Sequence, residues 1–580
     1  MIRSASRSAM GRSPTLAMFA AFAVLVTACA PTQAPGAAST QPQTQQSGPP
    51  KRIVAAVNSI PVALNNMIGA ATGSQPGMEA IGVMVNSGFT IVDNRGNITP
   101  QLVEAVPTTE NGLWRVLPDG RMEITWKIRE GAVWHDGTPF TSADMLFTHQ
   151  VATDSETLNV FAHRALRDIE SVEAPDARTV VTQWLRPYIY GNLAFGYDGD
   201  RSLLPFPKHL LEKPFLDDKA GFMNLPFWTT GFVGTGPYKL KEWNEGTGAT
   251  FVANDRYVLG RPKIDEIEVK FIPDVSTLVA NMLAGAVDVN LGRGLELEQA
   301  REILSRVEGA KTDNAVIGAN AAYPQFMDTK PAILRDSADF RRALLHGLDR
   351  QEMVDTLSFG LSTVANTFIH NQESDYKDIE SSIVKYAYDP RRATELIEGL
   401  GYRKGPDGVF ADAAGQKLGF EVRTSRGSER ILAAVASAWD RLGIAVEQNV
   451  VPPQLDRDIE YRATFPAFEI VRRGNYRWDL YRTLGSLEAP TAETRFNGGN
   501  RGRYQNADLD RILRAYDATV PLRERTQILG QIVNHVTDQV IVLGLYHGID
   551  ATVYAKRLNN VFGKYERTTQ VWNVHNWTLD

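Results

Sequence analysis

A chain of 580 residues is too long for one hydrophobic core, so the sequence predicts two or more lobes. Its 43% hydrophobic and 22% charged residues are ordinary for a soluble globular protein. The 61 basic and 67 acidic side chains give a formal net charge of −6 without a basic stripe, which argues against nucleic acid as a partner.

The first 28 residues are predicted to be a targeting segment. Three arginines and no acid precede an apolar run at 16–26, which is too short to span a bilayer. The run ends in Val-Thr-Ala followed by Cys29, the only cysteine of the chain. This arrangement resembles a bacterial lipobox, and the resemblance implies a signal peptide over 1–28 and a lipid on Cys29. An ordinary signal peptide with an incidental cysteine is the alternative.

Residues 29–51 are predicted to be a disordered tether, because their Pro, Gln, Ser, Thr, Ala and Gly cannot bury a core. No later stretch of about 18 apolar residues exists, so no transmembrane helix is predicted after the targeting segment. We therefore expect a protein of the periplasm or cell exterior, attached to a membrane through its N-terminal lipid.

Short strands dominate the chain from residue 52 to about 316. Apolar and polar residues alternate at 122–128 and at 267–271, as in strands with one buried face. Between these strands, Thr141 to Asp144 resembles a capping box at the start of a helix. From about residue 339, helices alternate with strands: an apolar stripe at 432–442 predicts a helix, and strands follow at 444–451 and 540–545. This alternation predicts an α/β lobe.

Several short motifs occur in an order that is similar to one known family. Trp134-His135-Asp136-Gly137-Thr138-Pro139 leads into the predicted capping box, and Gly234-Thr235-Gly236-Pro237-Tyr238 follows. These resemble motifs of the family-5 extracellular solute-binding proteins, the dipeptide-, oligopeptide- and nickel-binding group. The further matches, in family order, are Asn254 to Tyr257, Gly285 to Asp288, Phe340 to Leu344, Tyr388 to Pro390 and Arg503 to Asn506.

The resemblance implies an α/β fold, namely a two-lobe periplasmic-binding-protein clamshell of type II with an extra subdomain in lobe 1. The first lobe is expected at 52–315 and 545–580, and the second at 316–544. The family's role implies a peptide or small-molecule ligand held in the cleft between the lobes. It also implies delivery to an ABC permease with its ATPase subunits, by a monomer whose hinge closes around the ligand.

Chemical interpretations of the motifs are weaker than structural ones. Adjacent residues such as His135 and Asp136 rarely converge on one substrate atom, and Asp-Gly is first a turn signal. The glycines at 234 and 236 lack the Gly-Lys-Ser/Thr ending of a phosphate-binding loop, so a tight turn is expected. Metalloprotease, hydrolase and cysteine-pair motifs are missing. The sequence thus predicts no enzyme, no cofactor and no metal site.

The ligand is harder to predict than the fold. Peptide-binding members hold the peptide amino group with a second-lobe aspartate, and here the nearest counterpart is the segment 473–479. Its acidic position is not evident, so Asp479 is either a displaced substitute or unrelated. Arg472, Arg473, Arg477 and Arg482 favour an anionic or polar ligand anchored by Arg473. The candidate ligand-binding residues are Asn86, Phe89, Asn320, Tyr323, Arg473, Tyr476 and Trp478.

Two other functions stay open at this point. A sensor or chaperone lipoprotein with the same fold cannot be separated from an importer subunit by sequence, and genes for a permease and an ATPase beside this one would discriminate them. An exported hydrolase is less favoured, because the sequence offers no assembled nucleophile and base.

Overall fold

The computed structural model describes residues 49–580 apart from 72–75, 162–165, 167, 198–202, 294, 374, 457, 474–479 and 564–567. The predicted signal peptide, most of the tether and Cys29 lie outside the described residues. Residues 50–580 form one compact unit. None of its described helices combines the length and apolarity needed to cross a bilayer.

The unit is organised around one large mixed sheet. Among the described residues this sheet has ten strands. In spatial order they are β16 (Ala445–Val450), β15 (Gly419–Thr424), β17 (Phe468–Arg473), β12 (Lys311–Pro324), β18 (Leu543–Tyr554), β11 (Val289–Leu291), β1 (Arg52–Val57), β10 (Glu266–Phe271), β9 (Gly248–Ala253) and β8 (Tyr238–Asn244).

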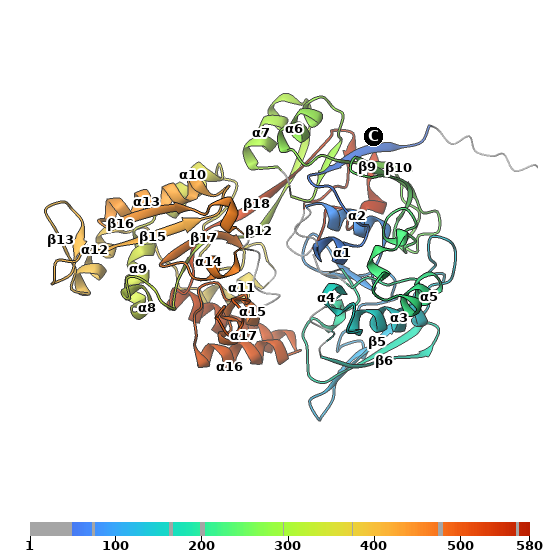
Figure 1. Ribbon diagram of the computed structural model, residues 1–580, viewed down its shortest axis with the longest axis horizontal. Helices are drawn as coiled ribbons and strands as arrows, with labels where there is room; N and C mark the ends of the chain where they lie inside the picture. The colour runs from blue at the N-terminus through green and yellow to red at the C-terminus, as the bar shows by residue number, and fades with distance from the viewer. Residues whose placement is uncertain are drawn as a thin grey trace, which may run out of the picture. The chain divides into compact units, whose positions relative to one another are not determined.

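Two long antiparallel strands join the halves of this sheet. Strands β12 and β18 pair with each other from Lys311 opposite Tyr554 to Ala322 opposite Leu543, with two register shifts between. One end of β18 pairs with β11, and one end of β12 pairs with β17. In Figure 1 both strands lead from the blue and green elements, here called the first lobe, to the yellow and orange elements, the second lobe. The predicted lobe boundaries at 315/316 and 544/545 fall within these two strands and stay predictions.

The first lobe also holds a smaller antiparallel sheet, β4 (Trp114–Val116), β5 (Met122–Lys127), β7 (Thr179–Trp184) and β6 (Ile169–Asp176). Strand β5 has alternately buried residues, as the period-two pattern predicted. Its helices are α1 (Asn66–Ala71), α2 (Met78–Val85), α3 (Ser142–Thr153), α4 (Leu158–Phe161), α5 (Lys208–Asp217), α6 (Val275–Leu283) and α7 (Leu297–Arg306). The predicted capping box of α3 is present: Thr141 and Asp144 bond each other's backbone N–H groups.

The second lobe packs helices against β15, β16 and β17. The predicted stripe of α13 is buried, and its Trp439 donates an indole hydrogen bond to the Leu344 carbonyl at 3.0 Å. Its helices are α8 (Ile333–Asp336), α9 (Ala338–His346), α10 (Arg350–Leu357), α11 (Tyr376–Ile379), α12 (Pro390–Gly399), α13 (Glu429–Leu442), α14 (Ile459–Ala463), α15 (Leu480–Leu484), α16 (Ala507–Ala518) and α17 (Leu522–Asp538).

In the described part of the chain there are also three two-stranded sheets: β2 (Thr90–Val92) with β3 (Ile98–Pro100), β13 (Arg403–Lys404) with β14 (Phe410–Ala411), and β19 (Leu558–Asn559) with β20 (Thr578–Leu579). The strand predicted at 540–545 begins three residues later than expected. Val540 has a left-handed backbone, with φ 47°, so the chain turns after α17 before it becomes extended at Leu543.

Candidate functional site

The carboxyl ends of parallel strands from both lobes meet at the middle of β12 and β18. In the first lobe β1 and β11 are parallel neighbours. Strand β11 starts opposite Tyr554, the last residue of β18, and runs antiparallel to β18 toward the middle of that strand. In the second lobe β15 and β17 are parallel, and Arg473 at the end of β17 pairs with Ala319 of β12. In open α/β sheets, ligands bind outside the carboxyl ends of parallel strands, where the strand direction or order changes. This junction is therefore the candidate site.

Three charged side chains from different parts of the chain meet at the junction. Asp550 lies on β18, and its Oδ1 is 3.3 Å from Arg472 Nη1 at the end of β17. Its Oδ2 is 3.7 Å from Arg293 Nε, just after β11. That second oxygen is buried and accepts no hydrogen bond from the described residues. Two guanidinium groups thus share one carboxylate, which leaves an excess of positive charge where the lobes join.

Gly548 allows Arg472 to lie across β18. A Cβ atom at this position would be 2.6 Å from Arg472 Cδ and 2.6 Å from the carbonyl oxygen of Ile317. Both distances are shorter than side chains tolerate, and the second contact is to backbone that cannot move alone. Glycine is therefore required here by close approach and not by an unusual backbone angle.

The predicted anchor, Arg473, lies on the opposite face of β17 from Arg472, because successive strand residues alternate. Its guanidinium lies 5.9 Å from the ring centre of Tyr323 and donates a hydrogen bond to the Gly499 carbonyl at 2.7 Å. Burial lowers the pKa of Arg473 and raises that of Tyr323. Arg473 thus already has a partner inside the second lobe, whereas Arg472 faces the junction. Ligand binding by Arg473 stays a prediction.

The other predicted ligand-binding residues divide into two groups. Asn320 and Tyr323 lie on β12 opposite β17, where Asn320 pairs with Arg472. Asn86 and Phe89 instead belong to the interior of the first lobe. Tyr476 and Trp478, together with Asp479, lie outside the described residues. The structure therefore brings Tyr323 and Arg473 together on one face of the sheet, whereas Asn320 lies on the other face with Arg472, toward the junction.

Asn86 and Phe89 have evident structural roles. The Asn86 side chain accepts hydrogen bonds from Thr235 N at 3.2 Å and Thr235 Oγ1 at 2.9 Å, and it donates to the Pro205 carbonyl at 3.1 Å. Phe89 is fully buried, and its ring centre lies 5.1 Å from that of Trp126. Contact of these two residues with ligand remains a prediction, and their packing requires none.

His135 joins two of the sequence motifs. Its Nδ1 accepts a hydrogen bond from Gly234 N at 3.1 Å, and its Nε2 lies 3.1 Å from the Gly236 carbonyl. Burial lowers the pKa of His135 to about 4, so the ring is neutral at pH 7. Gly137 has a φ of +97°, which confirms the predicted Asp-Gly turn.

Gly234 and Gly236 must be glycines because the backbone at the end of α2 leaves no room for a side chain. A Cβ at Gly234 would be 2.0 Å from the Val85 carbonyl oxygen, and one at Gly236 would be 2.4 Å from the Val85 carbonyl carbon. The glycines thus let this turn lie directly against the end of α2, as a structural turn and not as a phosphate-binding loop. Among the described residues, no group of three or more His, Cys, Asp or Glu side chains is placed to hold a metal ion.

Comparison with known proteins identifies the family. The family model of the bacterial extracellular solute-binding proteins, family 5 (middle region), matches residues 97–494. The chain belongs to this family. This confirms the family that the sequence motifs predicted. The predicted role as a substrate-binding protein of ABC importers is also confirmed, because curated relatives are ABC-transporter binding proteins. Family 5 proteins bind solutes and are not enzymes.

The similarity to known proteins covers most of the chain. The oligopeptide-binding protein AppA of Bacillus subtilis is 25% identical over 517 residues, which are 86% of each chain. The structure of NikZ from Campylobacter jejuni in complex with Ni(L-His) has a TM-score of 0.69 at 22% identity, covering 91% of this chain and all of NikZ. The periplasmic EDTA-binding protein EppA has a TM-score of 0.72 at 16% identity, covering 92% and 98%. These structures confirm the predicted two-lobe fold.

Further contacts connect the two lobes of this family 5 protein. The hydroxyl groups of Tyr190, in the first lobe, and Tyr516, on α16, lie 3.5 Å apart in a buried position. Arg430 at the start of α13 forms an ion pair with Glu298 of α7. The Arg301 guanidinium of α7 lies 4.1 Å from the ring centre of Phe359 in the second lobe. These pairs are formed with the lobes in the arrangement seen here.

Sequence reasoning did not find Arg293 or Asp550. Arg293 directly follows a short buried strand, and a charged residue at that position is a usable signal in an α/β fold. Asp550 lies within a long strand whose register is shifted beside it, and nothing local in the sequence marks it as a junction residue.

Proposed function

We propose that this protein captures a small solute with an anionic group at the junction of its lobes and delivers it to the permease of an ABC importer. The observation that carries this proposal is the shared aspartate: Arg293 Nε and Arg472 Nη1 lie 3.7 Å and 3.3 Å from the two oxygens of the Asp550 carboxylate. A ligand carboxylate or phosphate placed there would supply the missing negative charge.

The physical reason lies in the guanidinium group. It presents a planar fork of N–H donors that matches a carboxylate or phosphate with two parallel hydrogen bonds. Because Arg293 follows a first-lobe strand and Arg472 ends a second-lobe strand, an anion that contacts both binds the closed arrangement better than an open one. That difference in affinity is what drives closure.

The same charges disfavour the amino end of a peptide. An ammonium group would meet two guanidinium groups at this site, and the one described carboxylate is already shared between them. A relative with a small anionic cargo is compatible with this view, since one of the similar structures is named as an EDTA-binding protein. The cargo class proposed is therefore a small polar or anionic compound.

The test is to identify the ligand and then remove each arginine. Mass spectrometry of ligand released from the purified protein should find a compound with an anionic group. Calorimetry with that compound should show a loss of about 2–5 kcal/mol for Arg472→Gln and a smaller loss, of about 1 kcal/mol, for Arg293→Gln, whose side chain is 58% exposed. Arg441→Gln, on the exposed face of α13, is the matched control and should bind normally. A released ligand without an anionic group, or unchanged binding by Arg472→Gln, contradicts the proposal.

We further propose that Cys29 carries a lipid that holds the protein at the outer side of a membrane. Support comes from the lipobox-like sequence before this single cysteine and from the Pro- and Ser-rich tether after it. In cell fractionation, the Cys29→Ser variant should move from the membrane fraction to the soluble fraction. Equal partitioning of variant and wild type contradicts the lipid anchor.

A further inference from the structure

A second polar cavity lies in the second lobe, beside β18. It has a volume of about 330 Å³ and is lined by Gln351 of α10, Tyr376 of α11, His547 of β18 and seven residues of the segment between α10 and α11, namely Ser362, Thr363, Val364, Asn366, Thr367, Ile369 and Asn371. We call it the side pocket. Residues 362–364 run along β18, where His547 N donates to the Thr363 carbonyl at 2.9 Å and Val364 pairs with Tyr546. The pocket is therefore built on the second lobe and on one of the strands that join the lobes.

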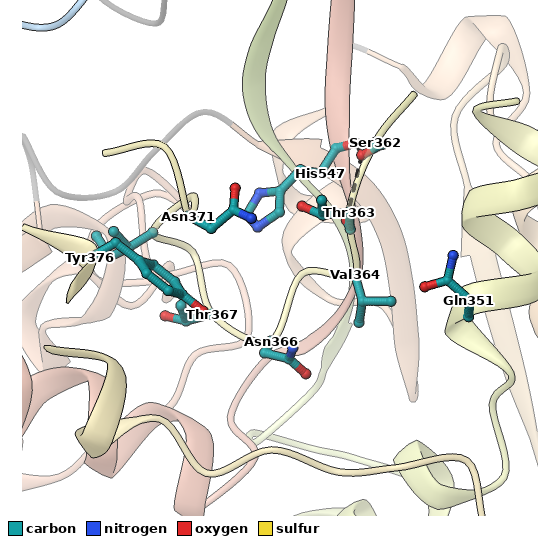
Figure 2. A pocket seen from close by; sticks show the side chains of 10 residues that line it. Gln351, Ser362, Thr363, Val364, Asn366, Thr367, Asn371, Tyr376 and His547 are labelled. Carbon is teal, nitrogen blue, oxygen red and sulfur yellow. Dashed lines mark hydrogen bonds between the residues drawn. The ribbon is translucent and has the colours of Figure 1, made fainter. Parts of the chain in front are cut away.

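The side pocket differs in chemistry from the charged junction. None of the ten residues that line it is an acid, a lysine or an arginine. Figure 2 shows Thr367, Asn371 and Tyr376 on one side of the cavity with His547 beside them. Burial lowers the pKa of His547 to about 3, so this ring is also neutral at pH 7. No ionised side chain lines the cavity itself; the Arg350 guanidinium lies behind its wall, where it donates a hydrogen bond to Asn366 Oδ1 at 3.2 Å.

One lining group lacks a partner. The Thr367 hydroxyl is buried and makes no hydrogen bond to the described residues, and the residue is only 6% exposed. This oxygen has almost no accessible surface, so a ligand in the cavity does not reach it in the arrangement seen here. The cavity is also far larger than one water molecule, which takes up about 30 Å³.

We propose that the side pocket binds a neutral carbohydrate. Most of its lining side chains are hydroxyls and amides, each of which both donates and accepts hydrogen bonds. Sugar hydroxyls have the same double capacity, so they can pair with such a lining in several orientations. Tyr376 adds an aromatic ring beside these polar groups. The volume falls within the usual range for small-molecule sites. This site is independent of the anionic cargo proposed above.

The probes are glucose and maltose, with glucose 6-phosphate as their charged counterpart. Saturation-transfer NMR with the full protein should show transfer to both neutral sugars and much weaker transfer to the phosphate ester. Tyr376→Phe should weaken glucose binding about five- to tenfold, the usual effect of one lost hydrogen bond, whereas Thr367→Val, whose hydroxyl oxygen is buried, should bind glucose like wild type. Thr356→Val is the matched control, because the Thr356 hydroxyl is exposed on α10 and bonds the Glu352 carbonyl.

Two further measurements separate loss of sugar binding from loss of folding, and the side pocket from the junction. Thr367→Val removes a hydroxyl that has no partner among the described residues, so it should unfold at the same or a higher denaturant concentration. Arg472→Gln should bind glucose like wild type even if it loses the anionic cargo. The proposal is overturned if neither sugar shows transfer with wild type, if Tyr376→Phe binds glucose normally, or if glucose 6-phosphate binds as well as glucose.

Discussion

Replacing Gly548 with alanine should damage both the stability and the ligand site. The new Cβ would lie 2.6 Å from Arg472 Cδ and 2.6 Å from the Ile317 carbonyl oxygen. The arginine can move away from this contact, but only by leaving Asp550. The carbonyl belongs to β12 and can move only if the paired strands shift. Overpacking of this kind costs about 1–3 kcal/mol.

The matched control is Gly399→Ala at the end of α12. A Cβ there meets no atom within 4 Å and the backbone is helical, so alanine should be neutral or stabilise by up to about 1 kcal/mol. Guanidinium unfolding followed by tryptophan fluorescence measures both variants, and calorimetry with the released ligand measures the site. If Gly548→Ala unfolds within about 0.5 kcal/mol of wild type and binds the ligand equally well, the packing argument is wrong.

Four further predictions address closure, pH and packing. Small-angle scattering should show a smaller radius of gyration when the released ligand saturates the protein, and an unchanged radius would count against hinge closure. Tyr516→Phe should weaken ligand binding about two- to fivefold, because it removes a hydroxyl that meets Tyr190 across the lobes. Stability should fall by about 3 kcal/mol between pH 6.5 and pH 4 through His135, because its folded pKa of about 4 lies below the unfolded value and only the unfolded chain takes up the proton. His135→Gln should flatten that part of the pH profile measured by denaturant unfolding. Trp439→Phe should lower the free energy of unfolding by about 2–4 kcal/mol, since it leaves the Leu344 carbonyl unpaired and a void beside it; an effect below about 1 kcal/mol would refute this.

Local patterns were sufficient to predict much of the fold. The capping box at Thr141 and the apolar stripe of α13 depend on residues a few positions apart, and helix geometry alone brings those residues together. The family resemblance then supplied the two-lobe arrangement, which no local pattern contains.

The site was predicted less well, for a physical reason. Arg472 and Arg473 are neighbours in sequence but lie on opposite faces of β17, and a shift of one residue exchanges them. Only the pairing with β12 and β18 decides which of the two faces the junction. Arg293 and Asp550 come from distant parts of the chain and meet only because β11 and β18 are neighbours. Such meetings depend on topology, which the sequence pattern does not encode locally.

The hydrogen bonds of the His135 ring have a consequence for how such proteins diversify. The ring bonds only to the backbone of the turn that holds Gly234 and Gly236. These residues therefore preserve the architecture whatever compound is carried. Under the proposed function, a change of cargo would need new side chains at the strand ends, at positions such as 293, 472 and 550, and would leave both turns intact. The turn motifs of this chain therefore carry information about its fold and none about its cargo.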